Sequence, residues 1–448
     1  MIVVFEVPSR VLIVGLGKSG RAAARLAAYD GSEVWVTDAR SEAELTTETQ
    51  ELPTGARSFF GGHPEACLEG VGLVVVSPGV SPNTDLLAAA RRRGIDLSTE
   101  VEFAWRHRPS AKLVAVTGSN GKSTVTELVA RMLVDAGQAA VAGGNIGTAA
   151  SQLALEDGWE TWVLEISSFQ AELLTAMRPQ VAVFLNLSQD HLERHPDIED
   201  YLAAKRRIFA FQGAGDVAVL NADDPAVVST PTAARRRTFS LSGPADARLD
   251  GERLLLQERV LTTAKEVALS GMHNLANALA AALAADALAA PMDSMASTLA
   301  RFEGLGHRHR TIHEEGGVRW VDDSKATNVG AVLAALRGYS DASVHLILGG
   351  QAKGQDFSVL FAEIQRAVAR LYLIGVDGPE IGAALRGAAE TEDCSSLEEA
   401  VSRAREMARS GECVLLAPAC ASFDQFANYR ERGDRFAVLA RRQAVACP

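Results

Sequence analysis

Residues 117–124, Thr-Gly-Ser-Asn-Gly-Lys-Ser-Thr, combine glycines, a lysine and hydroxyl side chains in a pattern suited to holding phosphate groups. The apolar run at 113–116 predicts a strand before this segment, and residues 125–133 predict a helix after it. In that setting the glycines let backbone N–H groups surround phosphate oxygens, Lys122 reaches the outer phosphates, and the Ser123 hydroxyl can ligate Mg²⁺. Val116 replaces the first glycine of the strict phosphate-loop pattern, but the strand-loop-helix context still predicts a phosphate site.

A second glycine-rich turn, Gly15-Leu16-Gly17-Lys18-Ser19-Gly20, follows a predicted strand and opens a predicted helix. Asp38 follows the next predicted strand, which is the arrangement of a dinucleotide-binding site. The same backbone geometry binds other diphosphates, so the motif alone leaves open NAD, a different nucleotide or a simple tight turn. An NAD-dependent dehydrogenase would leave the segment at 117–124 without a role.

Three residues after the predicted phosphate loop are suited to binding magnesium and phosphate. Glu165 ends a predicted strand, His191 follows another, and Lys205 lies in a predicted helix. A carboxylate and an imidazole at strand ends beside a phosphate loop can ligate Mg²⁺ or orient phosphate groups. Each alone is more often a surface group, and composition gives Lys205 no special role, but the order of the segments favours a site.

Polar clusters also follow predicted strands in the last third of the chain. They are Asp-Asp-Ser-Lys-Ala-Thr-Asn at 322–328, Gly-Gly-Gln-Ala-Lys-Gly at 349–354 and Ala-Pro-Ala-Cys-Ala-Ser-Phe-Asp at 417–424. Ligands of open α/β sheets gather at the carboxyl ends of strands, so these clusters favour binding loops. Lysines with hydroxyl groups suit a small dicarboxylate, while an ordinary capped turn is the alternative for any single cluster.

The elements that position these segments are short strands alternating with helices. The predicted strands form three series, at 11–14, 34–36 and 73–76, at 113–116, 162–164 and 181–185, and at 344–348, 371–374 and 413–416. We therefore predict an α/β fold of three consecutive domains. The first is a Rossmann-like domain at 1–110, and the third is a Rossmann-like domain at 301–448. The central domain at 111–300 is ATPase-like, contains the phosphate loop and includes an Ala-rich helix at 277–290.

Length and composition agree with a folded multidomain protein. The 448 residues are 47% hydrophobic and 22% charged, and a chain of this length usually forms more than one core. The net charge of -12 argues against sequence-independent binding of nucleic acid. The five scattered cysteines indicate neither a disulfide framework nor a zinc site. Without a secretory pattern or a membrane-spanning apolar run, we expect a cytoplasmic protein with no membrane insertion.

Taken together, the segments resemble the Mur ligases of peptidoglycan synthesis, and among them the members that add glutamate. The resemblance covers nearly the whole chain and is most specific at 117–124, 143–147 (Gly-Gly-Asn-Ile-Gly), 165–170 (Glu-Ile-Ser-Ser-Phe-Gln), 221–224 (Asn-Ala-Asp-Asp), 323–328 and 417–422. It implies an ATP-dependent ligase that joins D-glutamate to UDP-N-acetylmuramoyl-L-alanine (UDP-MurNAc-L-alanine) through an acyl phosphate, releasing ADP and phosphate. ATP, two Mg²⁺ ions and a monomeric state are then expected.

The resemblance also implies roles for individual residues. The expected ATP contacts are Gly118, Ser119, Asn120, Gly121, Lys122, Ser123, Thr124, His273, Asn274, Arg308 and Asp323. The expected UDP-sugar contacts are Gly15, Leu16, Gly17, Arg40, Gly79 and Asn145. The expected glutamate contacts are Thr327, Lys353, Ser422 and Tyr429. The expected catalytic residues are Lys122, His191, Lys205 and Lys325, and the expected metal ligands are Ser123, Glu165, His191 and a carbamylated Lys205.

Three positions depart from the family pattern. Ala39 replaces a hydroxyl residue, Tyr429 replaces a phenylalanine, and Arg310 replaces the glutamate that commonly follows His-Arg-x. Three alternatives to a D-glutamate ligase therefore stay open: a relative that adds L-glutamate, another Mur ligase, and a folylpolyglutamate synthase. A catalytically inactive nucleotide-binding regulator would have no need for Lys122 and Glu165 together with the other catalytic groups.

Overall fold

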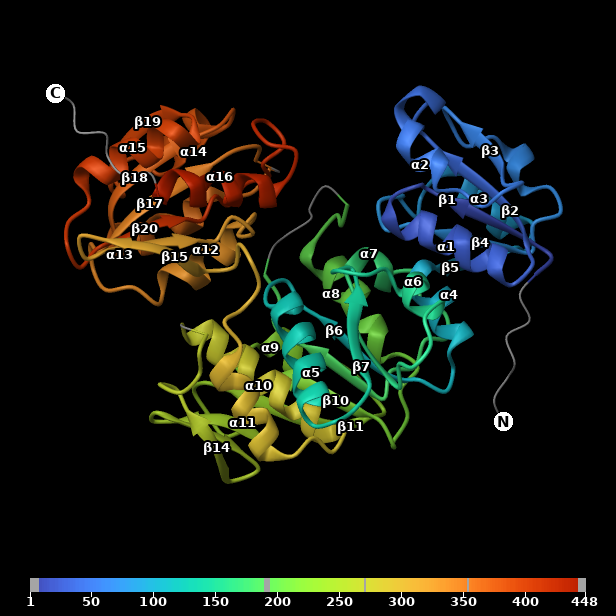
Figure 1. Ribbon diagram of the computed structural model, residues 1–448, viewed down its shortest axis with the longest axis horizontal. Helices are drawn as coiled ribbons and strands as arrows, with labels where there is room; N and C mark the ends of the chain where they lie inside the picture. Colours follow the sequence, from blue (N-terminus) through green and yellow to red (C-terminus); the bar gives the residue numbers. More distant parts are fainter. Residues whose placement is uncertain (1–7, 189–193, 270, 353, 442–448) are drawn as a thin grey trace. The chain divides into compact units, whose positions relative to one another are not determined.

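The computed structural model describes residues 8–188, 194–269, 271–352 and 354–441 (Figure 1). The chain divides into two compact units, of which the first is Met1–Leu187, Glu199–Glu266 and Ala276–Ala300, and the second is Ser188–Ile198, Val267–Leu275 and Arg301–Pro448. The three predicted series of strands form three separate sheets, so the predicted three-part α/β fold is confirmed. The boundaries near 110 and 300 stay predictions.

The first sheet has the order β3-β2-β1-β4-β5, and every neighbouring pair is parallel. Its strands are β1 (Arg10–Val14), β2 (Glu33–Asp38), β3 (Arg57–Phe60), β4 (Leu73–Val76) and β5 (Asp96–Thr99). Its helices are α1 (Lys18–Tyr29), η1 (Glu42–Leu45), α2 (Thr46–Gln50), η2 (Glu65–Leu68), α3 (Asp85–Arg92) and α4 (Glu100–His107). Because the strand order reverses at β1, the loops after β1 and β4 meet at a switch point, where such sheets bind ligands.

The second sheet has the order β14-β13-β12-β11-β10-β9-β6-β8-β7 and is parallel from β12 to β7. Its strands are β6 (Lys112–Thr117), β7 (Ala140–Gly144), β8 (Thr161–Glu165), β9 (Val181–Phe184), β10 (Val217–Asn221), β11 (Arg235–Ser240), β12 (Ala247–Asp250), β13 (Arg253–Leu256) and β14 (Arg259–Thr263). Its helices are α5 (Lys122–Asp135), α6 (Ala150–Ala154), α7 (Ser168–Ala171), α8 (Ile198–Arg206), η3 (Arg207–Phe209), α9 (Pro225–Val228), α10 (Met272–Ala287) and α11 (Met292–Arg301). Here β6 lies between β8 and β9, so the loops after these three strands are neighbours.

The third sheet has the order β15-β16-β20-β17-β18-β19, with β15 antiparallel and the other strands parallel. Its strands are β15 (Arg310–Glu315), β16 (Val318–Asp322), β17 (Val344–Gly349), β18 (Val368–Ile374), β19 (Glu390–Ser395) and β20 (Cys413–Leu416). Its helices are α12 (Val329–Leu336), η4 (Phe357–Leu360), α13 (Phe361–Ala367), α14 (Gly378–Ala384), α15 (Leu397–Met407) and α16 (Tyr429–Arg441). The polar clusters expected after β16, β17 and β20 therefore lie beside one another.

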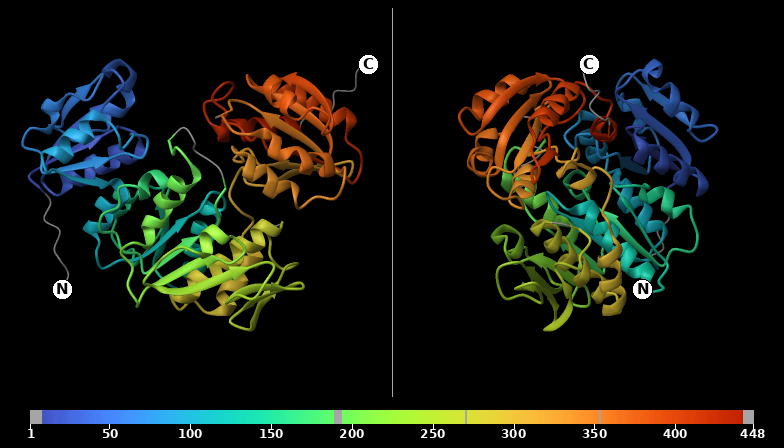
Figure 2. Two further views of the ribbon diagram at one scale, coloured as in Figure 1. Left: turned by 180° about the vertical axis from the view of Figure 1, so that it is seen from behind. Right: turned by 60° about the vertical axis from the view of Figure 1, so that its left-hand side comes forward.

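Helices cover both faces of the third sheet, as Figures 1 and 2 show. Leu346 and Leu348 of β17 pack into the core that contains α12 and α13, while Ile347 packs into the opposite core with α15 and α16. Successive side chains of a strand point to opposite faces, so a strand buried on both faces is a continuous apolar run. This burial explains why apolar runs in the sequence marked the strands.

The Ala-rich helix differs from its predicted range of 277–290, because α10 spans Met272–Ala287. Its carboxyl end is set by Ala289, which takes a left-handed conformation at φ 63°, and by the Ala290 N–H, which donates to the Ala285 carbonyl. This left-handed turn closes the helix before Pro291 is reached. Hydropathy could not locate the carboxyl end, because Leu288, Ala289 and Ala290 continue the apolar run beyond the last helical residue.

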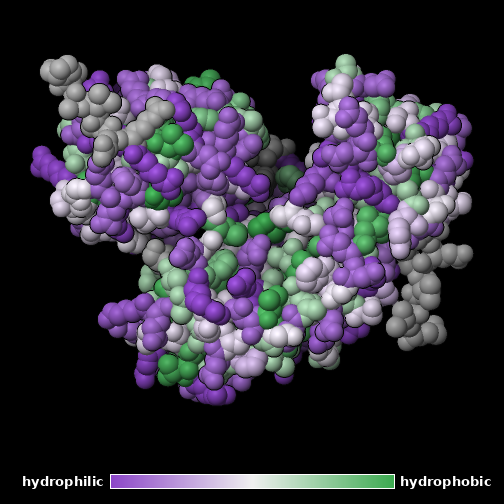
Figure 3. Space-filling view, viewed as in Figure 1, coloured by the Kyte–Doolittle hydropathy of each residue, from purple (hydrophilic) through white to green (hydrophobic). Residues whose placement is uncertain are grey.

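Hydrophilic residues predominate on the face shown in Figure 3, with hydrophobic ones scattered among them. Within the described residues, none of the helices is both long enough and apolar enough to cross a bilayer.

Candidate active site

The predicted phosphate loop joins β6 to α5, as the sequence indicated. Gly121 caps the amino end of α5 in a left-handed conformation at φ 84°, which glycine adopts without strain. A Cβ atom at this position would also collide with the side-chain oxygen of Asn277 in α10. Residues 118–124 thus form a tight turn at a helix amino end, where the helix dipole favours an anion.

Two lysines donate hydrogen bonds to the carbonyls of this loop. Lys122 Nζ lies 2.9 Å from Gly118 O and 2.8 Å from Ser119 O. Lys205 Nζ lies 2.8 Å from the same Gly118 O and 4.2 Å from the centre of the Tyr201 ring. Lys205 is only 1% exposed, although composition suggested a solvated lysine. The amino groups of both lysines therefore lie beside the loop where a polyphosphate would bind.

An oxygen-rich group lies next to the amino end of α5. The Ser123 hydroxyl donates to Glu165 Oε2, and Asn145 Nδ2 donates to Glu165 Oε1 over 2.8 Å. Glu165 ends β8 and is 3% exposed. Mg²⁺ prefers such hard oxygen ligands and is commonly held by one or two carboxylates together with substrate phosphates. Ser123 and Glu165 thus fit a magnesium ion beside a bound polyphosphate.

Asn186, at the end of β9, holds the phosphate loop in shape, a role that the sequence did not reveal. Its Oδ1 accepts the Asn120 N–H over 2.8 Å, and its Nδ2 donates to Asn120 O over 3.1 Å. The Ser119 N–H donates to Asn186 O over 2.9 Å. Amide side chains at strand ends are common, so only the strand order could show that Asn186 faces the phosphate loop.

The first glycine turn lies at the switch point of the first sheet. Gly15 has φ 87°. Its carbonyl accepts a hydrogen bond of 2.6 Å from the hydroxyl of Ser77. Ser77 lies in the loop after β4, which also contains Gly79. Gly17 caps the amino end of α1. The structure therefore brings the expected UDP-sugar residues of this turn to one loop cluster, together with Gly79.

Asp38 does not present the free carboxylate that a dinucleotide ribose requires. It accepts the Leu16 N–H over 2.8 Å and two guanidinium nitrogens of Arg40 over 3.0 and 2.9 Å. Burial alone would raise its pKa, but the hydrogen bonds from Arg40 and Leu16 outweigh burial and lower the pKa to about 2. The carboxylate fixes the glycine turn and Arg40, which weakens the NAD interpretation.

The segment between β7 and α6 links the glycine turn to the magnesium candidates. Lys18, the first residue of α1, donates from Nζ to Gly147 O. Two residues earlier, Asn145 bonds Glu165, as described above, and the Asn145 N–H donates to Glu165 O over 2.9 Å. The expected UDP-sugar residue Asn145 therefore adjoins the expected magnesium ligand, which is where a carboxylate would have to meet the outer phosphate.

Arg432 of α16 ties together the loops after β16 and β20 in the third sheet. Its guanidinium donates to Ser324 Oγ, Ser324 O and Cys420 O over 3.0, 2.9 and 3.1 Å. It is 1% exposed, and burial lowers its pKa to about 10, so it keeps its charge near neutral pH. Arg432 could not be recognised from the sequence, because a buried arginine in a helix resembles the solvated arginines around it.

The expected glutamate residues lie around these loops. Lys325 Nζ is 4.6 Å from the centre of the Tyr429 ring, and the Tyr429 carbonyl accepts the Ser324 hydroxyl over 2.8 Å. Ser422 is 3% exposed and follows β20, while Thr327 donates its N–H to Lys325 O over 2.8 Å. Tyrosine in place of phenylalanine at 429 preserves the aromatic face that the lysine contacts.

Three histidines lie near the expected nucleotide contacts of the second unit. His307 Nδ1 bonds Asp322 Oδ2 over 2.7 Å, which raises the pKa of His307. His309 lies 3.5 Å from Asp323 and edge-on to His273, with ring centres 5.6 Å apart. Burial, helped by the charge of His309, lowers the pKa of His273 to about 4, so this imidazole is neutral near pH 7. Asn274, 7% exposed, and Arg308, partly exposed, belong to the same unit.

Two of the predicted site residues, His191 and Lys353, lie outside the described residues. Of the departures from the family pattern, Ala39 is exposed beside Arg40, and Arg310 starts β15, where Nη2 lies 3.5 Å from Glu303.

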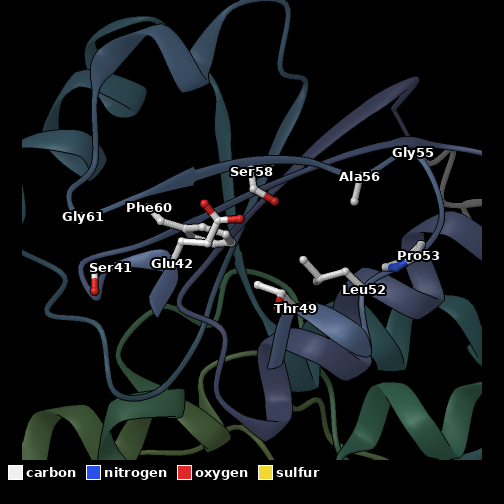
Figure 4. Close-up of a pocket in the computed structure, with 10 residues that line it drawn as sticks. All are labelled: Ser41, Glu42, Thr49, Leu52, Pro53, Gly55, Ala56, Ser58, Phe60 and Gly61. Atoms are coloured by element: carbon white, nitrogen blue, oxygen red, sulfur yellow. The ribbon is translucent and has the colours of Figure 1, made fainter. Parts of the chain in front are cut away.

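A separate pocket of about 510 Å³ lies at the edge of the first sheet (Figure 4). It is lined by η1, α2 and β3, including Glu42, Leu52, Ser58 and Phe60. Among its described lining residues it contains a carboxylate and no cationic side chain, so an anionic phosphate is disfavoured there. This pocket is therefore not a candidate for the phosphate sites.

Comparison with known proteins gives the family. Three family models match consecutive parts of the chain: the Mur ligase MurD-like N-terminal domain at 9–99, the Mur ligase middle domain at 116–285, and the Mur ligase glutamate ligase domain at 307–420. A UDP-N-acetylmuramoylalanine--D-glutamate ligase of Anaeromyxobacter dehalogenans is 42% identical over 97% of this chain and 98% of its own. The chain belongs to the Mur ligase family. A Mur ligase of the same description from Myxococcus xanthus is also 42% identical, over 96% of this chain and 97% of its own.

Solved Mur ligases share the fold at low sequence identity. The MurF ligase of Thermotoga maritima, solved in complex with ADP, has a TM-score of 0.63 and 17% identity and covers 96% of this chain and 97% of its own. The UDP-N-acetylmuramate-alanine ligase MurC of the same organism has a TM-score of 0.61 and 19% identity, covering 96% and 98%. The fold of this chain is therefore shared with these solved Mur ligases.

Proposed function

We propose that this Mur ligase joins D-glutamate to UDP-MurNAc-L-alanine with conversion of ATP to ADP and phosphate, as part of peptidoglycan synthesis. The observation that carries the proposal is 42% identity, over nearly the full length of both chains, to relatives described as D-glutamate ligases of this substrate. The site geometry supports it, because a phosphate loop with two lysines adjoins Asn145, an expected contact of the UDP-sugar.

The reaction must bring two anions together, the substrate carboxylate and the γ-phosphate of ATP. In the proposed first step a carboxylate oxygen forms a bond to the γ-phosphorus while the bond to the ADP oxygen breaks. Lys122 and the amino end of α5 would bind the phosphates, and Lys122 would exchange its bonds to Gly118 O and Ser119 O for phosphate oxygens. The lysine thereby offsets the charge repulsion that otherwise keeps the reactants apart.

Mg²⁺ is expected at Ser123 and Glu165, whose oxygens fit it, and when bound it would neutralise charge on the phosphates. His191, the further ligand implied by the family resemblance, lies outside the described residues. Asn145 holds Glu165 through its amide, which keeps the carboxylate in place beside the loop. The two-ion stoichiometry is part of the proposal.

Carbamylation of Lys205 is a further part of the proposal. Addition of CO₂ to a neutral amine forms an N–C bond, releases a proton and turns a cation into an anion. Lys205 is 1% exposed and packed against Tyr201, and burial of this kind favours the neutral amine that the addition requires. The carbamate would supply a carboxylate-like group at the metal site.

In the second step the amino group of D-glutamate would attack the acyl carbon, and the C–N bond would form as phosphate leaves. Thr327, Ser422 and Tyr429 would bind the dicarboxylate, and Lys353 is the further contact that the resemblance implies. Lys325, whose Nζ lies beside the Tyr429 ring, would reach the phosphate. Arg432 keeps the loops that carry Ser324 and Cys420 together, so the pocket is preorganised.

The proposal is tested by measuring phosphate release from ATP with UDP-MurNAc-L-alanine and a panel of amino acids. D-glutamate is expected to give release far above all other amino acids. Release with L-glutamate instead would establish the alternative stereochemistry, and release with a different amino acid would establish another Mur-type ligase. Release with neither glutamate enantiomer would contradict the proposal.

ATP and UDP-linked sugars are cytoplasmic metabolites, so we place the reaction in the cytoplasm. The proposed contacts all come from one chain, so the proposal requires only a monomer, which sedimentation analysis of the purified protein can test.

A further inference from the structure

Two glutamates on α4, Glu100 and Glu102, are completely buried at 0% exposure. Helix α4 connects β5, the last strand of the first sheet, to β6, which leads into the phosphate loop. Glutamate is among the residues that are least often fully buried, because removing a carboxylate from water is costly. Two such residues on one helix therefore call for a structural or functional explanation.

Glu102 has an ordinary structural explanation. Its carboxylate accepts the Thr175 N–H over 2.7 Å and the Thr175 hydroxyl over 2.9 Å. Arg106, one turn later on α4, donates to the same carboxylate over 3.0 Å and forms an ion pair with it. The charge of Glu102 is therefore matched by a cation, and its oxygens have partners.

Glu100 is bonded differently. Its Oε1 accepts the Ser151 N–H, and its carbonyl accepts the Ser151 hydroxyl over 3.5 Å. Its Oε2 has no hydrogen-bond partner among the described residues. Buried polar atoms almost always have partners, so the bonds to Ser151 are the ones that hold Glu100 within the described part of the chain.

Ser151 is the second residue of α6, which directly follows the segment 143–149. Further bonds hold that segment: Gly144 N–H to Thr148 O over 2.9 Å, the side-chain and backbone amides of Asn145 to Glu165, and Lys18 to Gly147 O. The segment thus touches the glycine turn of the first sheet and the magnesium candidate of the second. Glu100 anchors its carboxyl end.

We propose that Glu100 is a positioning residue that holds the segment 143–149, and with it Asn145, in the geometry that binds the UDP-sugar. The proposal rests on the proposed function for the identity of that ligand. The anchoring itself is a property of the free protein. Glu102 fixes the segment around Thr175 and has no bond to residues 143–149 among the described contacts, so it serves as a matched control on the same helix.

Hydrogen–deuterium exchange of the free protein tests the anchoring without any ligand. Glu100→Ala is expected to raise the exchange rate at least about tenfold in peptides covering 143–153, because the bond to Ser151 is lost. Exchange around Thr175 should stay unchanged, because Glu102 still holds that segment. Glu102→Ala is expected to raise the exchange rate around Thr175 and to leave it unchanged in peptides covering 143–153. Equal exchange at 143–153 in wild type and Glu100→Ala would overturn the proposal, whatever the enzyme's substrate.

Binding and kinetics then test the functional consequence. Glu100→Ala is expected to raise the KM and the calorimetric Kd for UDP-MurNAc-L-alanine at least about tenfold, and to raise the KM for ATP less, because Asn145 acts on the ATP site only through Glu165. Glu100→Gln keeps an acceptor for the Ser151 N–H and is expected to restore near wild-type values, which would assign the loss in Glu100→Ala to the missing acceptor. Similar changes in both KM values, or no rescue by glutamine, would overturn the proposal. Wild-type protein that fails to bind UDP-MurNAc-L-alanine would instead contradict the proposed function.

Discussion

Replacing Glu100 with glutamine is expected to stabilise the protein at pH 8 and to have little such effect at acidic pH. Burial raises the pKa of Glu100 from 4.5 to about 7, although hydrogen bonds from Ser151 partly oppose this. Below pH 4.5 the carboxyl is protonated in both the folded and the unfolded chain, so it contributes no pH dependence. Between pH 4.5 and 7 the unfolded chain loses the proton first, and the folded state becomes less stable as pH rises.

The magnitude follows from the two pKa values. A difference between 4.5 and about 7 corresponds to roughly 3 kcal/mol of lost stability above pH 7. Glutamine has no charge, so Glu100→Gln removes this term and leaves only a pH-independent offset from its unpaired amide. Between pH 5 and pH 8 the stability of the variant is therefore expected to gain roughly 2–3 kcal/mol relative to wild type.

Urea unfolding of wild type and Glu100→Gln at half-unit pH steps, followed by circular dichroism, measures this gain. Glu160→Gln is the control, because Glu160 is exposed directly before β8 and its substitution should shift the curve by less than about 0.5 kcal/mol at every pH. Parallel stability curves for wild type and Glu100→Gln from pH 5 to pH 8 would refute the assignment of a buried carboxyl that titrates near neutrality.

Gly121→Ala is expected to lower ATP turnover at least about tenfold and to destabilise the protein by about 1–3 kcal/mol, because a Cβ would collide with Asn277 and the φ of 84° is unfavourable. Steady-state kinetics and thermal melting measure the two effects. Lys205→Ala is expected to lose at least about a hundredfold in phosphate release and to regain part of it with added acetate, which would replace the carbamate. Arg432→Met is expected to cost about 2–4 kcal/mol in urea unfolding and to raise the KM for glutamate more than that for ATP.

Each of these variants has a control. Gly55→Ala has a similar φ of 85° with open space around the position, so it should retain full turnover. Full activity of unassisted Lys205→Ala would dismiss the carbamate. An unchanged glutamate KM in a folded Arg432→Met protein would show that Arg432 does not shape that pocket.

The sequence located central strands of each sheet, because these are buried on both faces and therefore appear as continuous apolar runs, while edge strands such as β3 and β19 were not predicted. Val74 and Val75 of β4 and Leu346 and Ile347 of β17 are all at most 1% exposed. Helix ends were less accessible, as α10 shows, because they depend on local backbone geometry at residues such as Ala289. The loops after the strands were predicted because glycine, lysine and hydroxyl residues gather there in a distinctive order.

Four structurally important residues escaped the sequence analysis, namely Asn186, Asn277, Arg432 and Glu100. Each acts through a partner that is distant along the chain, such as Asn186 on Asn120 or Arg432 on Ser324. A single asparagine, arginine or glutamate carries no mark of its partner, and each is more often a solvated surface residue.

The sequence by itself determined the chemistry of this protein: a phosphate loop at 117–124, a second glycine turn at the amino-terminal end, and lysine- and hydroxyl-bearing loops in the last third. Local residue types are enough for this, because each motif performs its role through its own backbone and side chains. The tertiary structure decided which of these groups meet. The order of strands around β6 placed Asn145 against Glu165 and Lys205 against Gly118, and the bonds of Asp38 to Leu16 and Arg40 argue against a dinucleotide site at the first glycine turn.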